Sequence, residues 1–346
     1  MYLGIEIGGT KLQLGVGAGD GTPPVALARF DVTLAHGASG ILSQIELRGL
    51  ELVEGHPIRG VGCGFGGPID AAAGRVIKSH HVEGWQDFGL ANWLSKVFKV
   101  PAVLANDADT AGLAEARFGA GCGRNPVFYV TVGTGIGGGL IIDGRIYRGS
   151  GAGAAELGHL RPGLSSDRPD QIVEELASGW GIAAAAQSRI MGGDVSHSLG
   201  PLMAGNRPLR PEAVRQRLIE VEEAAEEHAA DLLERCDGVL ERLSTRHVAQ
   251  AAEAGNEIAQ QVLGRAMQAL GWAIAQMITL TAPAVVVVGG GVSLMGEQWF
   301  FAPLRKEVAR YVFPPLAKTF NLLPAQLGEE VVIHGALALA RERVEA

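Results

Sequence analysis

The sequence predicts an α/β fold built from two similar halves that face each other across a cleft. Short runs of apolar, β-branched residues alternate with longer helical patterns, as expected for strands that are covered by helices. One arrangement also occurs twice, namely a strand, a glycine turn with a threonine, and a return strand. It lies at Tyr2 to Val16 and again at Val130 to Ile142, and this internal repeat indicates a duplicated unit.

The second copy belongs to Val127 to His159, the stretch richest in candidate functional residues. Its first strand ends in Gly133-Thr134-Gly135, where glycines let the backbone approach a ligand and point N–H groups at it. The return strand ends at Asp143-Gly144, which predicts a type I′ hairpin. A glycine-rich loop with Glu156 and His159 follows. Any single glycine is better explained by a tight turn, whereas the two threonine-containing turns together favour a phosphate chain bound from both sides.

The remaining segments continue the alternation of strands and helices. Apolar runs between glycines or prolines predict strands at Val25 to Val32, Ile58 to Phe65, Pro101 to Ala105, Pro283 to Val288 and Glu329 to Ile333. Helical spacing predicts helices at Gly40 to Glu54, Leu90 to Phe98, Thr110 to Phe118, Ile172 to Ile190, Thr245 to Glu253, Asn256 to Thr281, Met295 to Tyr311 and Gly335 to Val344. Helices therefore follow most of the predicted strands.

The segment Pro211 to Leu243 repeats apolar or small residues at a three–four spacing. This spacing predicts one long amphipathic helix, or two with a break near Gly238. Its apolar stripe must be covered, either by the larger domain of the same chain or by the same surface of a second subunit. We expect a packing or assembly role.

Asn106 and Asp107 come where a predicted strand ends and a predicted helix begins. Asn and Asp are favoured helix caps, so Asp107 could have a purely structural role. The alternative is a carboxylate at the carboxyl end of a strand, where α/β folds place their ligands.

Length, charge and composition limit the possible functions. The 346 residues suffice for two domains, and the net charge of −8 without a basic stripe argues against a nucleic-acid partner. Three widely spaced cysteines indicate neither a disulfide framework nor a zinc ribbon. The most apolar helix, Ala266 to Ala282, is too short for a membrane span, and no signal peptide is expected before Met1. We therefore expect a cytoplasmic protein.

Together these segments resemble the ROK family of sugar kinases and repressors, within the actin-like ATPase superfamily. The resemblance rests on motifs in the same order: GIEIGGTK at 4–11, GCGFGGPID at 62–70, GWQDFGLANWL at 84–94, NDADTAGLAE at 106–115, VGTGIGGGLIIDGRIYRG at 132–149, ELGH at 156–159 and VVVVGGGVS at 285–293. It implies duplicated, ribonuclease H-like domains with an interdomain cleft. The smaller domain would comprise 1–107 with a C-terminal helix at 334–346, and the larger 108–333 with a helical insertion at about 206–243.

The resemblance also assigns roles by position. It implies ATP and phosphate binding by three turns: Gly8, Gly9, Thr10 and Lys11; Gly133, Thr134 and Gly135; and Gly289, Gly290 and Gly291. It implies sugar binding by Asn106, Glu156, His159 and Glu174, and it places Asp107 in the position of the catalytic base. Glu174 is chosen over Glu175 because the family's glutamate comes four residues before a Ser-Gly pair, here Ser178-Gly179.

Two departures from the family pattern concern metals. The family's first loop begins with Asp near Mg²⁺, whereas this chain has Glu6, whose longer side chain would act through water. The family's zinc site pairs the histidine of the ELGH-like motif with three cysteines, but Arg161 to Glu174 has none. We therefore expect no zinc, and His159 is left as a sugar ligand or a loop anchor.

The implied activity is phosphorylation of a hexose by ATP with Mg²⁺, at O6, as in a glucokinase. The family's repressors carry an N-terminal winged-helix extension that this sequence does not show, which favours the kinase branch. The alternative is a catalytically impaired sugar- or nucleotide-binding protein that kept the fold. The expected partners are a hexose, ATP and a second copy of the chain, without nucleic acid or membrane.

Overall fold

The computed structural model describes residues 1–79, 82–150, 153–163, 171–192, 203–204, 207–208 and 224–346. Two five-stranded sheets form its framework, with strand orders β3-β2-β1-β4-β7 and β10-β9-β8-β13-β14. In each sheet the first strand pairs antiparallel with the second and parallel with the fourth. The two orders are therefore the same, which confirms the duplicated α/β fold expected from the sequence. We call each sheet with its covering helices the first and the second lobe.

The first sheet brings the predicted site residues to one edge. Its strands are β1 (Tyr2–Ile7), β2 (Lys11–Gly17), β3 (Ala26–Asp31), β4 (Val61–Phe65) and β7 (Ala102–Asn106). The parallel register places Ile7 beside Phe65, and Phe65 beside Asn106. The three chain segments that follow these residues consequently leave the sheet side by side.

The second sheet has the same arrangement. Its strands are β8 (Val127–Val132), β9 (Ile136–Ile142), β10 (Arg145–Ile146), β13 (Val285–Gly289) and β14 (Asn321–Pro324). Gly289 pairs with Thr131, so the turns after β8 and β13 lie at one edge. Between β9 and β10, Asp143 and Gly144 have φ of 52° and 70°, which confirms the predicted type I′ hairpin.

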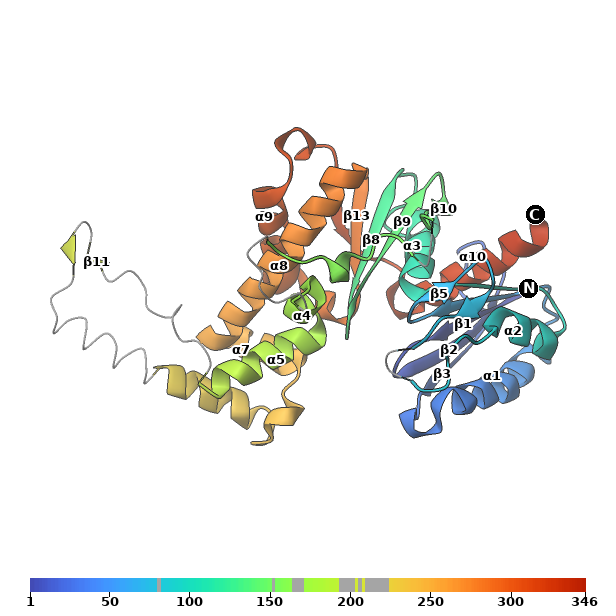
Figure 1. Cartoon of the computed structure of the whole chain (residues 1–346), viewed down its shortest axis with the longest axis horizontal. Coiled ribbons are helices and arrows are strands. Elements are labelled where there is room, and N and C mark those ends of the chain that lie inside the picture. The colour runs from blue at the N-terminus through green and yellow to red at the C-terminus, as the bar shows by residue number, and fades with distance from the viewer. Residues whose placement is uncertain (80–81, 151–152, 164–170, 193–202, 205–206, 209–223) are drawn as a thin grey trace.

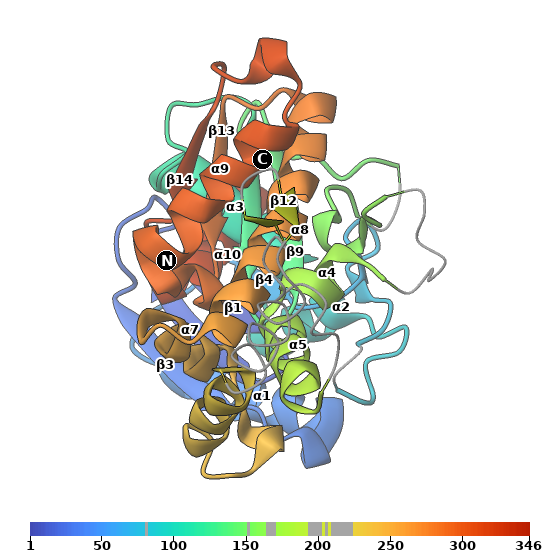
Figure 2. The same cartoon turned by 90° about the vertical axis from the view of Figure 1, so that its left-hand side faces the viewer.

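Helices separate the two sheets and cover their outer faces. Helices α1 (Gly37–Val53) and α2 (Leu90–Phe98) cover the first sheet, and α4 (Val173–Ala177), α5 (Gly179–Ile190), α7 (Thr245–Glu253), α8 (Glu257–Thr281) and α9 (Ala302–Tyr311) belong to the second lobe. In Figures 1 and 2, α4, α5, α7 and α8 lie on the side of the second sheet that faces away from the first. Two short pairs complete the strands, β5 (Ile69–Asp70) with β6 (Arg75–Val76) and β11 (Met203–Ala204) with β12 (Arg207–Pro208).

Helices α3 (Asp107–Phe118) and α10 (Val331–Glu345) lie between the lobes (Figure 1). Helix α10 packs on β1 and β4, whereas α3 packs on β8, β9 and α10. A Cβ atom on Gly62 would lie 1.9 Å from Ala336 O, and one on Gly335 would lie 2.0 Å from Thr110 O. Glycine at these two positions therefore lets α10 press against both β4 and α3. The packing of α10 on the first sheet favours the proposed domain division of 1–107 with 334–346 against 108–333.

Each lobe has its own hydrophobic core. In the first lobe, Leu3, Ile5 and Leu14 pack among the buried side chains of α1, α2 and β4. In the second lobe, the large cluster joins β8 and β13 to α8 and α9. No helix in the described parts of the chain is long and apolar enough to cross a membrane.

Some predicted element boundaries were wrong. The β-branched run in Glu329 to Ile333 is not a strand: 328–330 form a 3₁₀ turn, and Val331 begins α10. The run is helical because Val332 and Ile333 pack on the first sheet at Gly64 and Gly15. The helix predicted at Ile172 to Ile190 divides into α4 and α5. In the segment Met295 to Tyr311, only α9 is an α-helix, and it follows a 3₁₀ turn and a π turn.

The described part of the long insertion packs on its own lobe. A helix covers 224–234, and the chain turns before Gly238, where φ is 70°. Leu232, Cys236 and Leu243 are buried in the core of the second lobe. This part of the apolar stripe is therefore covered by the same chain, while the prediction for 211–223 lies outside the described residues.

Candidate active site

Both predicted phosphate turns are tight connections between antiparallel strands. In the first, Gly8 N–H donates to Lys11 O at 2.8 Å between β1 and β2. In the second, Gly133 N–H donates to Gly135 O at 2.9 Å between β8 and β9. Thr10 and Thr134 are exposed at the tips. The two turns therefore occupy equivalent places in the two lobes and leave their hydroxyl groups available to a ligand.

The predicted adenosine turn lies against the second phosphate turn. Gly290 has φ of 90°, and a Cβ atom there would lie 2.5 Å from Val132 O. Only glycine tolerates both this conformation and this approach. Ser293 Oγ donates to Gly290 O at 2.7 Å and holds the turn, while Gly291 has open space around it. Gly290 thus lies directly against the backbone of Val132, the residue before Gly133.

Asn106, rather than Asp107, caps helix α3. Asn106 Oδ1 accepts the N–H groups of Ala108 and Asp109 at 2.9 and 3.2 Å, and its Nδ2 donates to Gly67 O at 3.3 Å. Asp107 is the first residue of the helix, and its Oδ1 accepts the adjacent Ala108 N–H at 2.9 Å. The side chain of Asn106 also makes a hydrogen bond to the Asp107 carboxyl. The capping role considered for Asp107 is therefore filled by its neighbour Asn106.

The surroundings of Asp107 favour its neutral form. Burial raises its pKa to about 6, and the carboxylate of Glu156 acts in the same direction, although the Ala108 N–H opposes them. A Cβ atom on Gly66 would lie 3.2 Å from Asp107 Oδ2. Glycine at this position leaves that face of the carboxylate open. A carboxylate with a pKa near 6 is suited to accept a proton at neutral pH.

Glu6 is tied to two neighbours on the adjoining strand. Its Oε2 accepts Gln13 Nε2 at 2.8 Å, and its Oε1 lies 3.6 Å from Lys11 Nζ. Burial raises the pKa of Glu6 to about 7 and Asp107 adds to the rise, against the pull of Lys11. Mg²⁺ in phosphoryl-transfer sites uses one or two carboxylates together with substrate phosphates. Two carboxylates whose ionised forms are disfavoured in each other's presence fit such a cation.

Glu174 and the following residues attach α4 to the second phosphate turn. Glu174 Oε2 accepts the Ile136 N–H at 2.7 Å, and Gly179 N–H donates to Gly133 O at 2.8 Å. Ser178 Oγ accepts the Gly181 N–H at 3.2 Å and caps α5. The role of Glu174 as a sugar ligand stays a prediction, and the structure shows a direct hydrogen bond between it and the residue that follows the predicted second phosphate turn.

The carboxyl group of Glu156 interacts electrostatically with three other predicted site residues, Asp107, His159 and Glu174. It precedes the 3₁₀ turn Leu157–His159. Its pKa is raised by loss of solvent and by Glu174, while His159 lowers it. Since Glu156 also acts on Asp107, the structure brings Asp107, Glu156, His159 and Glu174 into one region.

Sequence reasoning missed Asp109. This side chain is 7% exposed, and its Oδ1 has no hydrogen-bond partner among the described residues. Burial raises its pKa to about 7, Arg148 lowers it, and Glu156 and Asp107 raise it. The available signal was a second Asp in Asn106-Asp107-Ala108-Asp109, placed like Asp107 in the first turn of the helix.

Within the residues that the structure describes, no cluster of three His, Cys, Asp or Glu side chains could hold a metal ion by itself. Positions 164–170, between His159 and Glu174, are not among them. The expected absence of zinc stays a prediction.

Comparison with known proteins gives relatives along the whole chain. A glucokinase of Thermotoga maritima is 28% identical over 342 residues, which cover 99% of this chain and 98% of that protein. A xylose repressor of Caldicellulosiruptor bescii is 24% identical over 284 residues, which cover 82% of this chain and 62% of the repressor.

A solved structure has a similar fold. The crystal structure of a ROK family glucokinase from Streptomyces griseus in complex with glucose and AMPPNP has a TM-score of 0.77 and 29% identity, with 99% of each chain covered. The fold is thus that of the actin-like ATPases. The model of the ROK family matches residues 2–343, and this chain belongs to the ROK family.

Proposed function

We propose that this protein is an ATP-dependent sugar kinase that phosphorylates a hexose at O6. One observation carries the proposal: Asp107 lies at the sheet edge that also holds the first predicted phosphate turn. It does not serve as the helix cap, and its pKa is raised. The relatives named as glucokinases support the same activity. A homodimer and a cytoplasmic location belong to this proposal.

Phosphoryl transfer requires mainly positioning and stabilisation of charge. The backbone N–H groups of both glycine turns and the ammonium group of Lys11 would hold the ATP phosphates, with the adenosine against Gly289 to Gly291. Glu6, with Asp107 nearby, would hold Mg²⁺, directly or through water. When bound, Mg²⁺ neutralises the negative charge of the phosphates.

The sugar hydroxyls would be oriented by Asn106, Glu156, His159 and Glu174. Asp107 would then accept the proton of the attacking O6 hydroxyl in line with the γ-phosphate. Because Asn106 Oδ1 and Nδ2 already bind backbone groups, we assign Asn106 a second task, namely fixing the Gly66–Gly67 turn beside Asp107. Glu174 would couple the sugar to the ATP turn through its bond to Ile136.

A sugar- or nucleotide-binding protein without catalysis is the second candidate. The observation in its favour is that Glu6 already has Lys11 and Gln13 as partners, so its role toward Mg²⁺ is not required to explain its position. A repressor among the relatives points to the same class.

An ADP-release assay over a panel of hexoses and N-acetylhexosamines separates the two candidates. We expect sugar-dependent ADP release with at least one hexose, formation of its 6-phosphate, and loss of turnover in Asp107→Asn. Calorimetry on the same samples measures sugar and ATP binding. Binding without any turnover would establish the second candidate instead.

A further inference from the structure

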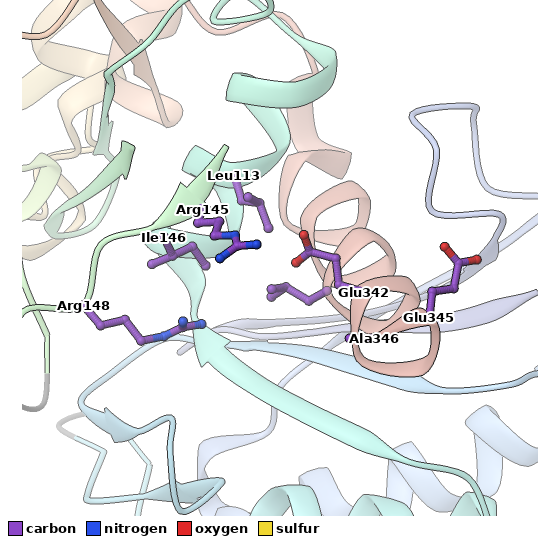
Figure 3. A pocket seen from close by; sticks show the side chains of 8 residues that line it. Leu113, Arg145, Ile146, Arg148, Glu342, Glu345 and Ala346 are labelled. Carbon is purple, nitrogen blue, oxygen red and sulfur yellow. The ribbon is translucent and has the colours of Figure 1, made fainter. Parts of the chain in front are cut away.

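A cavity of about 480 Å³ lies between the lobes (Figure 3). Its floor is apolar and consists of Leu113 of α3, Ile146 of β10 and Leu339 of α10. Arg145 and Arg148 stand on the wall of the second lobe, and Glu342 and Glu345 of α10 stand on the opposite wall (Figure 3). The cavity therefore combines an apolar floor with charged walls.

The acidic side chains of this cavity already have basic partners. Glu342 Oε1 accepts Arg117, which also donates to Gly144 O at 2.7 Å. Glu345 pairs with Arg341 at 3.0 Å.

The two arginine side chains of the cavity have fewer partners than its glutamates among the described residues. Across the described residues, Arg145 makes no ion pair and no side-chain hydrogen bond. Arg148 makes none there either, and its charge acts on the buried Asp109. Two guanidinium groups beside an apolar floor suit a small organic anion, because Arg binds phosphate or carboxylate oxygens through paired N–H groups.

Along helices α3 and α10, the cavity and the predicted sugar site lie on opposite sides of the contact between Thr110 and Gly335. Helix α3 begins at Asp107, and Leu113 comes six residues later, about 9 Å along the axis. Helix α10 begins beside Gly64 near the edge of the first sheet and reaches the cavity at Leu339. Between these ends, Gly335 approaches Thr110 O so closely that no Cβ atom fits. This contact holds the two helices together between the two sites.

We propose that this cavity is a regulatory site for a small organic anion, which Arg145 and Arg148 bind and which favours closure of the lobes over the sugar. Rotation about the Thr110–Gly335 contact that narrows one end of the interlobe space widens the other. An occupant of the cavity holds its walls apart and thus stabilises the closed sugar site. By linkage, sugar and anion then raise each other's affinity by the same factor. This coupling rests on the proposed sugar-kinase function, whereas anion binding itself does not.

Calorimetric titration of phenyl phosphate into the full chain tests the site. AMPPNP at saturation occupies the phosphate turns and prevents binding there. We expect one phenyl phosphate per chain, no binding of the neutral benzyl alcohol, and at least about tenfold weaker binding in Arg145→Glu. Arg145→Gln should be intermediate. Arg310→Glu, on the surface of α9, is the matched control and should bind as the parent does.

A second titration, with a saturating sugar taken from the kinase panel, tests the coupling. We expect the affinity for phenyl phosphate to rise by at least about fivefold, the lower end of usual coupling. Absence of binding, or equal binding by Arg145→Glu with an unchanged melting temperature, would refute the site. Binding that no sugar alters would refute its regulatory role. Anion binding in a chain without kinase activity would leave the site standing and overturn only the proposed function.

Discussion

Glu174 Oε2 accepts the backbone N–H of Ile136 at 2.7 Å, and a Cβ atom on Gly135 would lie 2.6 Å from the same oxygen. The carboxylate of α4 therefore rests directly on the second phosphate turn. The charge of Glu174 also raises the pKa of Glu156, a second predicted sugar ligand. A sugar that moves Glu174 would move the predicted second phosphate turn with it.

Glu174→Ala should impair ATP and sugar binding together. The substitution leaves the Ile136 N–H without its acceptor, at a cost of about 1–3 kcal/mol in unfolding free energy if water does not replace it. We expect higher KM values for both substrates, measured by steady-state kinetics. Glu174→Gln keeps an acceptor oxygen and should keep the KM for ATP closer to that of the parent. Equal KM values for ATP in the parent and in Glu174→Ala would contradict this coupling.

Asp107→Asn should abolish most turnover without loss of the helix. A general base contributes roughly 10²–10⁴-fold, so kcat should fall by that factor while sugar affinity is kept. Asn106→Ala is the matched comparison, because it removes the cap and should lower the unfolding free energy by about 0.5–2 kcal/mol. Chemical denaturation and kinetics on both variants separate the two roles. Normal turnover in Asp107→Asn would leave Asp107 without a catalytic function.

The raised pKa of Asp107 predicts a pH dependence of both activity and stability. Its ordinary pKa is 3.8, and the folded protein raises it to about 6. Activity should fall on the acid side below about pH 6, because the base becomes protonated. Stability changes in the opposite direction. Between about pH 4 and 6 the carboxyl of Asp107 is ionised in the unfolded state and protonated in the folded state. Its contribution to the unfolding free energy therefore falls as pH rises.

Urea denaturation of the parent and of Asp107→Asn across pH 4 to 8 measures this contribution. Asn cannot ionise, so the variant should gain stability relative to the parent as pH rises through that window, and the difference should level off above about pH 6. A constant difference across the whole range would show that the folded protein does not shift this carboxyl.

Glu6→Gln tests the metal role of Glu6. The amide oxygen of Gln can still accept Gln13 Nε2, so the variant should fold. If Glu6 serves Mg²⁺, the concentration of Mg²⁺ for half-maximal activity should rise and kcat should fall. An unchanged Mg²⁺ requirement together with a lower melting temperature would assign Glu6 to a structural pair with Lys11.

The sequence predicted the sheets well because their signals are local. Glycine turns, β-branched runs and the Asp143-Gly144 hairpin act over a few residues, and the repeat of Tyr2 to Val16 indicated the duplication. The strand expected at Glu329 to Ile333 failed because a distant contact decides its conformation. Val332 packs against Gly64 as part of a helix, and β-branched residues follow such packing over their own preference.

Family resemblance predicted which residues form the candidate site. It did not predict the hydrogen bonds that hold those residues in place. The split of tasks between Asn106 and Asp107 depends on the direction of two adjacent side chains, which residue type alone does not fix. The bond from Glu174 to Ile136 spans 38 residues of sequence. Asp109 is of a residue type that usually lies on the surface. It is buried because β9 and β10 pack against α3, and Arg148, which follows β10, acts on its charge.

Leu232 tests what the long insertion does. From the sequence, the apolar stripe could be covered either by the same chain or by a second subunit. The structure buries Leu232 in the core of the second lobe, with 0% exposure. Leu232→Ala should therefore lower the unfolding free energy by about 2–5 kcal/mol, because it removes buried methyl groups and leaves a cavity. Val239→Ala, in the same segment but 38% exposed, is the control and should have a much smaller effect. Denaturation measures stability, and light scattering measures mass in solution. A lower mass for folded Leu232→Ala, with unchanged stability, would instead place this residue in a contact between subunits.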